Sequence, residues 1–317
     1  MSATGIHTPS RRRLPALLAA AGVLLLVLAP FQLYPVFVMK ALCFALFACA
    51  FNLLIGFGGL LSFGHAAFFG GGAYVAAHAA ARWGLTPELA ILAGTLAAAL
   101  LGLAMGFLAI RRQGIYFSMI TLALAQMVYF VCLQAPFTGG EDGIQGVPRG
   151  HLFGLLDLSH PLAMYYTVLA IFLGGFWLVH RIAHSPFGQV LKAIRENEPR
   201  AVSLGYDTDR YKLAAFVLSA ALAGLAGATK AIVLQLATLL DVQWQMSGEV
   251  ILMTLLGGIG TLGGPVVGAF LVVALEHGLA TAGLPVTVVI GLVFIACVLV
   301  FRRGIMGEIG HRLRVKL

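Results

Sequence analysis

Long apolar segments separated by short polar connectors run through most of the sequence. A helix that crosses the hydrocarbon core of a bilayer needs about 20 predominantly apolar residues. The stretches that meet or approach this length are Leu14–Leu33, Val36–Phe57, Leu60–Ala81, Glu88–Ile110, Gly114–Gln134, Pro161–Val179, Lys212–Leu236, Gly248–Ile259, Gly264–Ala280 and Pro285–Phe301. The pattern predicts an all-α fold, a polytopic helical bundle of about 8–10 transmembrane segments with glycine-broken helices. We expect a single transmembrane domain over residues 1–317.

The longest polar interruption is Arg181–Lys212. Ser185 is suited to cap a helix whose first residue is Pro186, and Pro199 is expected to end that helix. Apolar residues at i, i+3, i+4 and i+7 spacing form one stripe along it: Phe187, Val190, Leu191 and Ile194. A second short apolar run ends at Gly205, which is suited to a C-cap. We expect this amphipathic loop to dock its apolar stripe on another protein.

The composition excludes a soluble protein. Hydrophobic residues make up 60% of the 317 residues, charged residues make up 10%, and the mean hydropathy is +0.97. Soluble domains carry about 25% charged residues. No polar stretch is long enough to form a separate soluble domain. The four cysteines (Cys43, Cys49, Cys132 and Cys297) lie within apolar segments and form no CxxC pair, so we expect them to pack in the interior.

The formal charge of +8 reflects membrane topology rather than nucleic-acid binding. Sixteen of the 20 lysines and arginines fall in four regions, residues 11–13, 111–112, 181–212 and 302–316. All four lie on one side if the spans alternate, which predicts an even number of crossings with both termini in the cytoplasm. No basic face interleaved with aromatic residues indicates a nucleic-acid partner. A cleaved signal peptide after Arg11–Arg13 is the alternative for the first segment, but no A-x-A site follows it.

Two apolar segments, Gly56–Gly72 and Gly257–Gly268, are unusually rich in glycine. Gly59–Gly64 and Gly258–Gly263 share the pattern Gly, apolar, any, Ser or Thr, apolar, Gly. Broken helices in corresponding halves of a transporter indicate a translocation path. The residues assigned to that path are Asn52, Gly59, Ser62, Phe63, Gly64, His65, Gly258, Thr261 and Gly263.

Close helix packing is the alternative role for these glycines. The GxxxG steps at Gly260, Gly264 and Gly268 would allow it, and packing is the preferred role for Gly102 and Gly106. Isolated polar residues within the spans raise a similar choice. Asn52 and His78 are interpreted as hydrogen-bonded interhelical donors, and Lys40 and Glu249 as residues near span ends whose charges reach the interface. We expect Lys230 to pair with a carboxylate, and Glu276 is a candidate for ion coupling.

The polar connector after the fifth span, residues 135–160, is rich in glycine and proline. It is either a plain extracytoplasmic connector or a partner-facing loop that caps the path. The residues assigned to the second role are Thr138, Gly139, Gly140 and Gly143.

The sequence contains no recognised enzymatic motif. The sequence has no G-x-x-x-x-G-K-[ST], H-E-x-x-H or G-x-S-x-G motif, and no metal-ligand cluster. Ser62 and His65, three residues apart, raise an intramembrane hydrolase as an alternative, but no third group orients the histidine. We therefore expect a chain without catalytic activity, cofactor or metal.

Five motifs occur in order: GGLLSFGHAAFFGGGAY, GIYFSMITLALAQ, TGGEDGIQGVP, SPFGQVLKAIRENEPRAVSLGYD and GGIGTLGGPVVGA. Together they resemble the membrane permease subunits of branched-chain amino acid ABC importers, in particular the larger-loop member of the usual permease pair. The resemblance covers residues 40–303. It implies a type II importer fold in the bacterial inner membrane, lipid around the chain, and a sister permease. It also implies two cytoplasmic ATP-binding subunits that use ATP and Mg, and an extracytoplasmic substrate-binding protein.

The resemblance also identifies residues 181–212 as the cytoplasmic loop that couples to the ATPase. The residues assigned to coupling are Ser185, Pro186, Phe187, Gly188, Val190, Leu191, Ile194, Arg195, Glu196, Asn197, Ala201 and Gly205. The importer signature E-A-A-x-x-x-G is incomplete, since only Ala201 and Gly205 fit it. Two alternatives stay open: a permease for urea, short amides or another small polar solute, and a secondary transporter that needs no ATPase.

Overall fold

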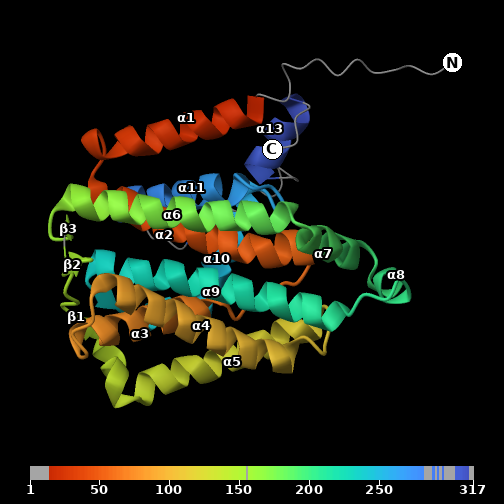
Figure 1. Cartoon of the computed structure of the whole chain (residues 1–317), viewed down its shortest axis with the longest axis horizontal. Coiled ribbons are helices and arrows are strands. Elements are labelled where there is room, and N and C mark those ends of the chain that lie inside the picture. Colours follow the sequence, from red (N-terminus) through yellow and green to blue (C-terminus); the bar gives the residue numbers. More distant parts are fainter. Residues whose placement is uncertain are drawn as a thin grey trace.

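The computed structural model describes residues 14–154, 156–281, 288–289, 291–292, 295 and 304–313. Long helices dominate it (Figure 1). The main helices are α1 (Leu14–Leu28), α2 (Pro35–Asn52), α3 (His65–Ala81), α4 (Pro87–Ala109), α5 (Ile115–Gln134), α6 (Pro161–His184), α9 (Thr208–Leu234), α10 (Trp244–Gly257) and α11 (Gly264–Thr281). The π-helical turn η3 (Leu53–Phe57) extends α2. Among the described residues, five helices are long and apolar enough to cross a membrane: Pro35–Phe57, α4, α5, α6 and α9.

Short elements occupy the two ends of this bundle. The helices α7 (Pro186–Glu196) and α8 (Glu198–Ser203) lie at one end, which we call the α7–α8 end (Figure 1). Two-residue strands lie at the opposite end, which we call the strand end: β1 (Ile144–Gln145), β2 (His151–Leu152), β3 (Leu156–Asp157) and β4 (Leu236–Ala237). Antiparallel pairs form between β1 and β4 and between β2 and β3. The short helices η2 (Ala29–Phe31), η4 (Pro136–Thr138), η5 (Gly140–Asp142), η6 (Leu239–Asp241) and α13 (Gly304–Leu313) complete the described elements.

The predicted helical bundle is confirmed, with shifted boundaries. The predicted span Leu60–Ala81 becomes helical only at His65, since residues 58–64 are largely non-helical. The predicted Gly248–Ile259 begins earlier, at Trp244. Pro199 does not end the first loop helix as predicted: α7 ends at Glu196, and Pro199 lies in the first turn of α8, where a missing N–H costs nothing. The last predicted span, Pro285–Phe301, lies mostly outside the described residues, as do Arg11–Arg13, Cys297 and the C-terminal cations.

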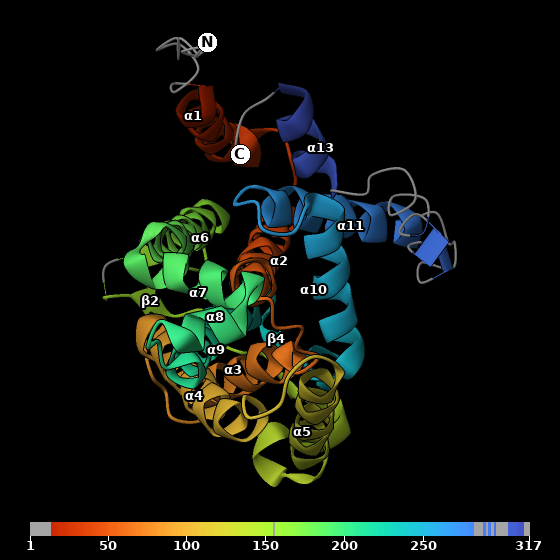
Figure 2. The ribbon, with the colours of Figure 1, turned by 90° about the vertical axis from the view of Figure 1, so that its right-hand side faces the viewer.

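The core forms around α2, α3 and α9. The most apolar 18-residue window of Pro35–Phe57 is 89% buried, against 28% for α5 and 33% for α4. The helix α2 packs against α9, α11, α6 and α10, whereas α3 packs against α9 and α4. Figure 2, viewed from the α7–α8 end, shows α2 surrounded by these helices and α5 at the periphery. An apolar helix buried on all sides shows no amphipathic stripe, so its sequence alone does not reveal its neighbours.

Glycine allows α3, α4 and α9 to approach each other closely. A Cβ at Gly227 of α9 would lie 1.9 Å from the carbonyl oxygen of Phe69 in α3, and one at Gly72 would lie 2.7 Å from Cα of Gly224. A Cβ at Gly102 of α4 would lie 2.4 Å from that of Ala220. Helices in a membrane associate through close packing because lipid is as apolar as their side chains. The packing role predicted for Gly102 and Gly106 is confirmed.

The first prediction compares two glycines of this layer. Gly227→Ala should lower the thermal unfolding temperature of the purified protein, because the new methyl group would meet backbone that cannot rotate away. Such overpacking costs about 1–3 kcal/mol. Gly71→Ala is the matched control: its Cβ would make an ordinary contact at 3.6 Å from Leu101, so it should have little effect or stabilise α3. Equal unfolding temperatures for the two variants would contradict this account.

Candidate functional site

The two glycine-rich breaks predicted from the sequence meet in the structure. Residues 58–64 link α2 to α3, and residues 258–263 link α10 to α11. Asn52, which is 1% exposed, joins them. Its Nδ2 donates to the carbonyl of Thr261 at 2.8 Å, and its Oδ1 accepts from the backbone N–H of Gly260 at 2.9 Å. We call residues 56–64 and 258–264 the glycine junction.

Two glycines are required for this contact. A Cβ at Gly56 would lie 2.3 Å from Oδ1 of Asn52 and 2.8 Å from the backbone nitrogen of Gly260. Gly260 itself has a φ of +76°, a conformation that residues with a side chain rarely adopt. The interhelical donor role predicted for Asn52 is therefore confirmed, and its two partners come from the other break.

Arg195 connects the junction to α7. Its Nη1 donates to the carbonyl of Gly56, at the end of the extended α2. The same nitrogen would lie 3.7 Å from a Cβ at Gly260, and Cγ of Arg195 would lie 2.8 Å from a Cβ at Gly59. One side chain of α7 therefore hydrogen-bonds to Gly56 and lies close to Gly260 of the other break. Lys192 of the same helix lies over the ring of Phe57, 5.2 Å from its centre.

Capping interactions fix α7 and α8, and those predicted at Ser185 and Gly205 are confirmed. Ser185 caps α7 by accepting from the N–H of Gly188 at 3.3 Å, and Asn197 caps α8 by accepting from that of Arg200 at 3.1 Å. Gly205, with a φ of +87°, ends α8: its N–H bonds to Val202, and the N–H of Tyr206 bonds to Ala201.

The predicted docking stripe faces the chain's own bundle, which corrects the expectation that it contacts another protein. Leu191 is fully buried and Ile194 is 3% exposed. Their helix, α7, packs against α6, α9 and η3. The stripe has helical periodicity because it packs the loop against its own spans. Phe187 contributes to this packing by stacking on Tyr211 of α9, with 5.5 Å between the ring centres. An ion pair between Lys212 and Glu198 ties α8 to α9.

The apolar side chains left exposed lie on and after α8. Val202 is 55% exposed, Leu204 is 69% exposed and Tyr206 is 40% exposed. Among the residues assigned to coupling, Pro186, Arg195, Glu196, Asn197 and Gly205 are exposed, and Gly188 and Ala201 are buried. Sequence reasoning missed Val202, Leu204 and Tyr206 because α8 has only six residues, too few for an apolar period to appear.

Several residues assigned to a path wall lie in the interior instead. Ser62 and His65 are fully buried. The Nε2 of His65 hydrogen-bonds Ser219 at 2.8 Å, and the hydroxyl of Ser219 donates to the carbonyl of Ala50 at 2.5 Å. Because Ser219 has only one proton, Nε2 of His65 is the donor in the first bond. Interhelical hydrogen bonding accounts for this histidine better than contact with a passing solute does.

The same geometry overturns the hydrolase alternative. Ser62 lies before the first residue of α3, and its hydroxyl accepts from the N–H of Gly64 at 3.1 Å rather than contacting His65. Gly64 is buried, Phe63 is half-buried, and the N–H of Phe63 donates to Thr121 at 3.2 Å. Within the described residues, no group of three His, Cys, Asp or Glu side chains could hold a metal ion.

The remaining path residues belong to the junction itself. Thr261 donates to the carbonyl of Gly258 at 2.7 Å and accepts from the N–H of Gly264 at 3.2 Å, which closes the turn between α10 and α11. Gly258 is buried beneath Gly304 of α13, and Gly263 is half-buried. Close helix packing also operates here, because a Cβ at Gly268 would lie 1.8 Å from the carbonyl of Met253. Gly59 and Gly260 are the exposed members of the junction.

At the strand end, the loop after α5 folds back on the bundle. Thr138 is fully buried and donates to the carbonyl of Cys132 at 2.5 Å. A Cβ at Gly143 would lie 2.3 Å from the carbonyl of Ala237, where β1 pairs with β4. The loop and α3 enclose a cavity of about 590 Å³ lined by Gly139, Gly143 and other residues. Nearby, the N–H of Ser159 donates to Asp157 and lowers the pKa of that carboxyl group.

Ion pairs account for Lys230, Lys40 and Glu276 within the helices. Lys230 pairs with Asp241, as expected for a buried lysine, although the carboxylate comes from η6 rather than from a neighbouring span. Lys40 pairs with Glu276 at 3.2 Å and does not simply reach the interface. The same pair removes Glu276 as a free ion-coupling carboxylate. The Nδ1 of His78 donates to the carbonyl of Phe137 at 3.1 Å, as predicted for an interhelical donor.

Comparisons with known proteins agree with this architecture. A family model described as "Branched-chain amino acid transport system / permease component" matches residues 36–301. The chain is 30% identical over 245 residues to the high-affinity branched-chain amino acid transport system permease protein LivM of Escherichia coli (strain K12), and 29% identical over 245 residues to that of Salmonella typhimurium. Each alignment covers 70% of this chain and 58% of the relative.

A more distant relative is the autoinducer 2 import system permease protein LsrC of Klebsiella pneumoniae, 32% identical over 159 residues. That alignment covers 47% of this chain and 44% of the relative. The chain thus spans little more than half the length of the curated relatives that it matches. No solved structure matches it.

The second prediction concerns the link between the two breaks. Asn52→Ala should lower the thermal unfolding temperature, because Thr261 and Gly260 lose their partner in the junction. An unsatisfied buried polar group costs about 1–3 kcal/mol. Gln145→Ala is the control, since it removes an exposed side-chain hydrogen bond of 3.3 Å at the strand end. If Asn52→Ala unfolds at the same temperature as the control, the junction does not depend on this amide.

Proposed function

Because this chain belongs to the family of branched-chain amino acid transport system permease components, we propose that it is a membrane-spanning subunit of an ATP-driven importer for branched-chain or related amino acids. The relatives in Escherichia coli and Salmonella typhimurium carry this transport in their names. The chain would supply half of the translocation pathway and hydrolyse nothing. A sister permease, two cytoplasmic ATP-binding subunits and an extracytoplasmic substrate-binding protein would complete the importer.

The observation that carries this proposal is the hydrogen bond of Arg195 to Gly56, close to Gly260 at the point where the two glycine breaks meet. In the proposed importer, the α7–α8 end faces the cytoplasm, in agreement with the six cations of residues 181–212. ATP binding and hydrolysis in the partner subunits would move α7 and α8. Arg195 would transmit that movement to the ends of α2, α10 and α11. Buried Leu191 and Ile194 favour movement of α7 together with the spans on which it is seated.

The proposed ATPase contact lies on the exposed part of the loop. Val202, Leu204 and Tyr206 form an apolar group beside charged residues, which is the usual composition of a protein interface core and its rim. The strand end would then receive the substrate-binding protein, with the loop around Thr138 and Gly143 as part of the surface. Cargoes such as urea or short amides stay as alternatives within the same architecture. A secondary transporter is less well supported, since Glu276 is already paired.

The third prediction separates the loop's outer and inner faces. In the complete transporter, Leu204→Asp should reduce copurification of the ATP-binding subunits about tenfold, a loss expected from removing a buried apolar anchor. Leu204→Met is the conservative control and should retain them. Leu191→Asp should instead reduce the yield of the folded permease itself, because the charge would be buried. Undiminished copurification with Leu204→Asp would exclude this residue from the ATPase contact.

The fourth prediction tests transmission through Arg195. Arg195→Gln should leave the ATP-binding subunits bound but lower amino acid uptake per ATP hydrolysed in proteoliposomes, about tenfold if one charge-assisted hydrogen bond carries the coupling. Arg195→Lys should retain part of the activity because it keeps the charge. Gln189→Ala, at an exposed position of the same helix, is the control. Unchanged uptake with Arg195→Gln would show that movement reaches the spans by another route.

A further inference from the structure

Four ionisable side chains lie within two turns of the helix ends at the strand end of the bundle. Lys40 is five residues after the start of α2, and Glu249 is five residues after the start of α10. Glu276 is five residues before the end of α11, and Lys230 is four before the end of α9. At 1.5 Å per residue, each lies roughly 6–8 Å inside its helix. With Asp241 of η6, they form what we call the charge layer.

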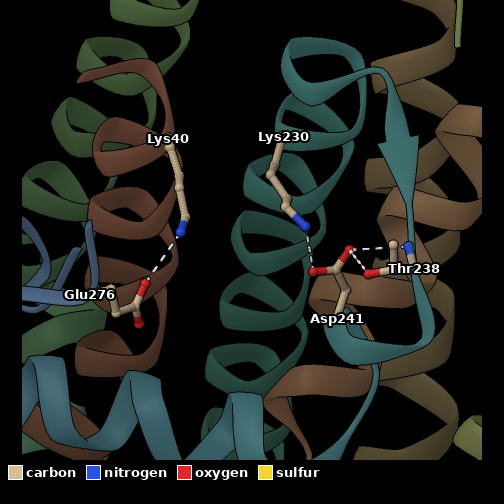
Figure 3. A network of polar contacts seen from close by, with 5 residues as sticks. All are labelled: Lys40, Lys230, Thr238, Asp241 and Glu276. Atoms are coloured by element: carbon tan, nitrogen blue, oxygen red, sulfur yellow. Dashed lines mark hydrogen bonds and ion pairs between the residues drawn. The ribbon is translucent and has the colours of Figure 1, made fainter. Parts of the chain in front are cut away.

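One half of the charge layer is closed. Lys230 and Asp241 have side chains that are 7% and 2% exposed. One carboxylate oxygen of Asp241 accepts from Lys230, and the other accepts from the backbone N–H and the hydroxyl of Thr238, both at 3.4 Å (Figure 3). Both oxygens are satisfied. This pair fastens η6 to α9, and its burial closes it to a ligand.

The other half is open. Lys40 has a side chain that is 36% exposed, and of its three N–H donors one bonds to Glu276 at 3.2 Å. The ammonium also lies 5.6 Å from the centre of the Phe44 ring. Glu249 is half-buried and interacts electrostatically with the charges of both pairs. Within the described part of the chain, it has no hydrogen-bond or ion-pair partner.

Charges at this depth are not expected to face lipid. Ionisable groups in transmembrane helices face a protein interior or a water-filled cavity and mark solute pathways. The outward faces of α4 and α5 are apolar by contrast, with exposed leucines and aromatic residues such as Leu96, Leu100, Phe107 and Phe130. The side of the bundle formed by α2, α10 and α11 is therefore expected to border a polar space rather than lipid.

We propose that the open half of the charge layer binds the zwitterionic head of a free α-amino acid as it enters the pathway. The carboxylate of Glu249 would accept from the α-ammonium group, and the remaining donors of Lys40 would bind the α-carboxylate. Glu276 would hold Lys40 in place. A free acceptor beside spare donors is complementary to a zwitterion, whereas a neutral amide or urea would leave the Glu249 charge unpaired.

This inference rests on the proposed function and names the part of the substrate that the chain itself recognises. The proposed site contacts only the ammonium and carboxylate groups of the substrate and does not select its apolar side chain. That selection would then belong to another subunit. The site would act on a group common to all amino acids.

The test uses the complete transporter in proteoliposomes, with radiolabelled leucine and loaded binding protein. Glu249→Gln should lower leucine uptake per ATP hydrolysed about tenfold or more, the loss expected for one charge-assisted hydrogen bond. ATPase activity stimulated by the loaded binding protein should stay within about twofold of wild type, because that signal precedes release of the substrate. Glu249→Asp should recover part of the uptake. Glu88→Gln, which removes a carboxylate on α4 at the same end, is the control and should behave as wild type.

Three outcomes would overturn the inference. Wild-type uptake per ATP with Glu249→Gln would show that the carboxylate does not contact the substrate. Loss of the copurifying sister permease in that variant would make Glu249 a subunit contact. A sodium-dependent uptake by wild type that disappears in the variant would make it a cation site. Absence of leucine uptake by the wild-type transporter would instead refute the proposed function.

Discussion

Every break in a membrane helix exposes backbone groups that lipid cannot satisfy. In this protein, a single buried amide satisfies two such groups. Asn52 lies one residue before the turn that ends α2, and its side chain donates to one residue and accepts from another in the break between α10 and α11. The two breaks are thereby held against each other, although more than 200 residues separate Asn52 from its partners. The positions of α3 and α11, which start from these breaks, depend on that contact.

The helix α7 is attached to the glycine junction, which links the junction to the cytoplasmic loop of the proposed importer. An amphipathic helix at the end of a bundle could have been a free docking surface, but its apolar stripe is buried on its own spans. Arg195 extends from it to the carbonyl of Gly56, and Lys192 lies over the ring of Phe57. A rigidly seated helix with a polar contact to the end of the extended α2 is suited to transmit movement. Apolar side chains on and after α8 stay exposed. The two helices of the loop therefore differ in role: α7 attaches the loop to its own spans, and α8 offers a surface for a partner.

The two ends of the bundle differ in their chemistry. Basic side chains and glycine breaks gather at the α7–α8 end, whereas the strand end contains the charge layer beneath folded loops. The pair between Lys230 and Asp241 is buried, while the side chain of Lys40 is 36% exposed and that of Glu249 is half-buried. Similar residue types therefore act as a structural clamp in one pair and as an accessible polar surface in the other.

The sequence by itself determined the number and order of most helices, their approximate bounds, and the caps of α7 and α8, because these depend on apolar length and on local hydrogen bonds. It also placed the two glycine breaks and identified Asn52 as an interhelical donor. Tertiary structure alone decided which way the apolar stripe of α7 faces. The sequence pattern of such a stripe is the same whether the helix packs on its own chain or on a partner. It also decided that Ser62 and His65 are interior groups, and that Lys40 pairs with Glu276. Contacts between residues far apart in the chain depend on how the helices cross. A helix that is apolar on every side has no hydrophobic periodicity from which its crossing geometry could be predicted.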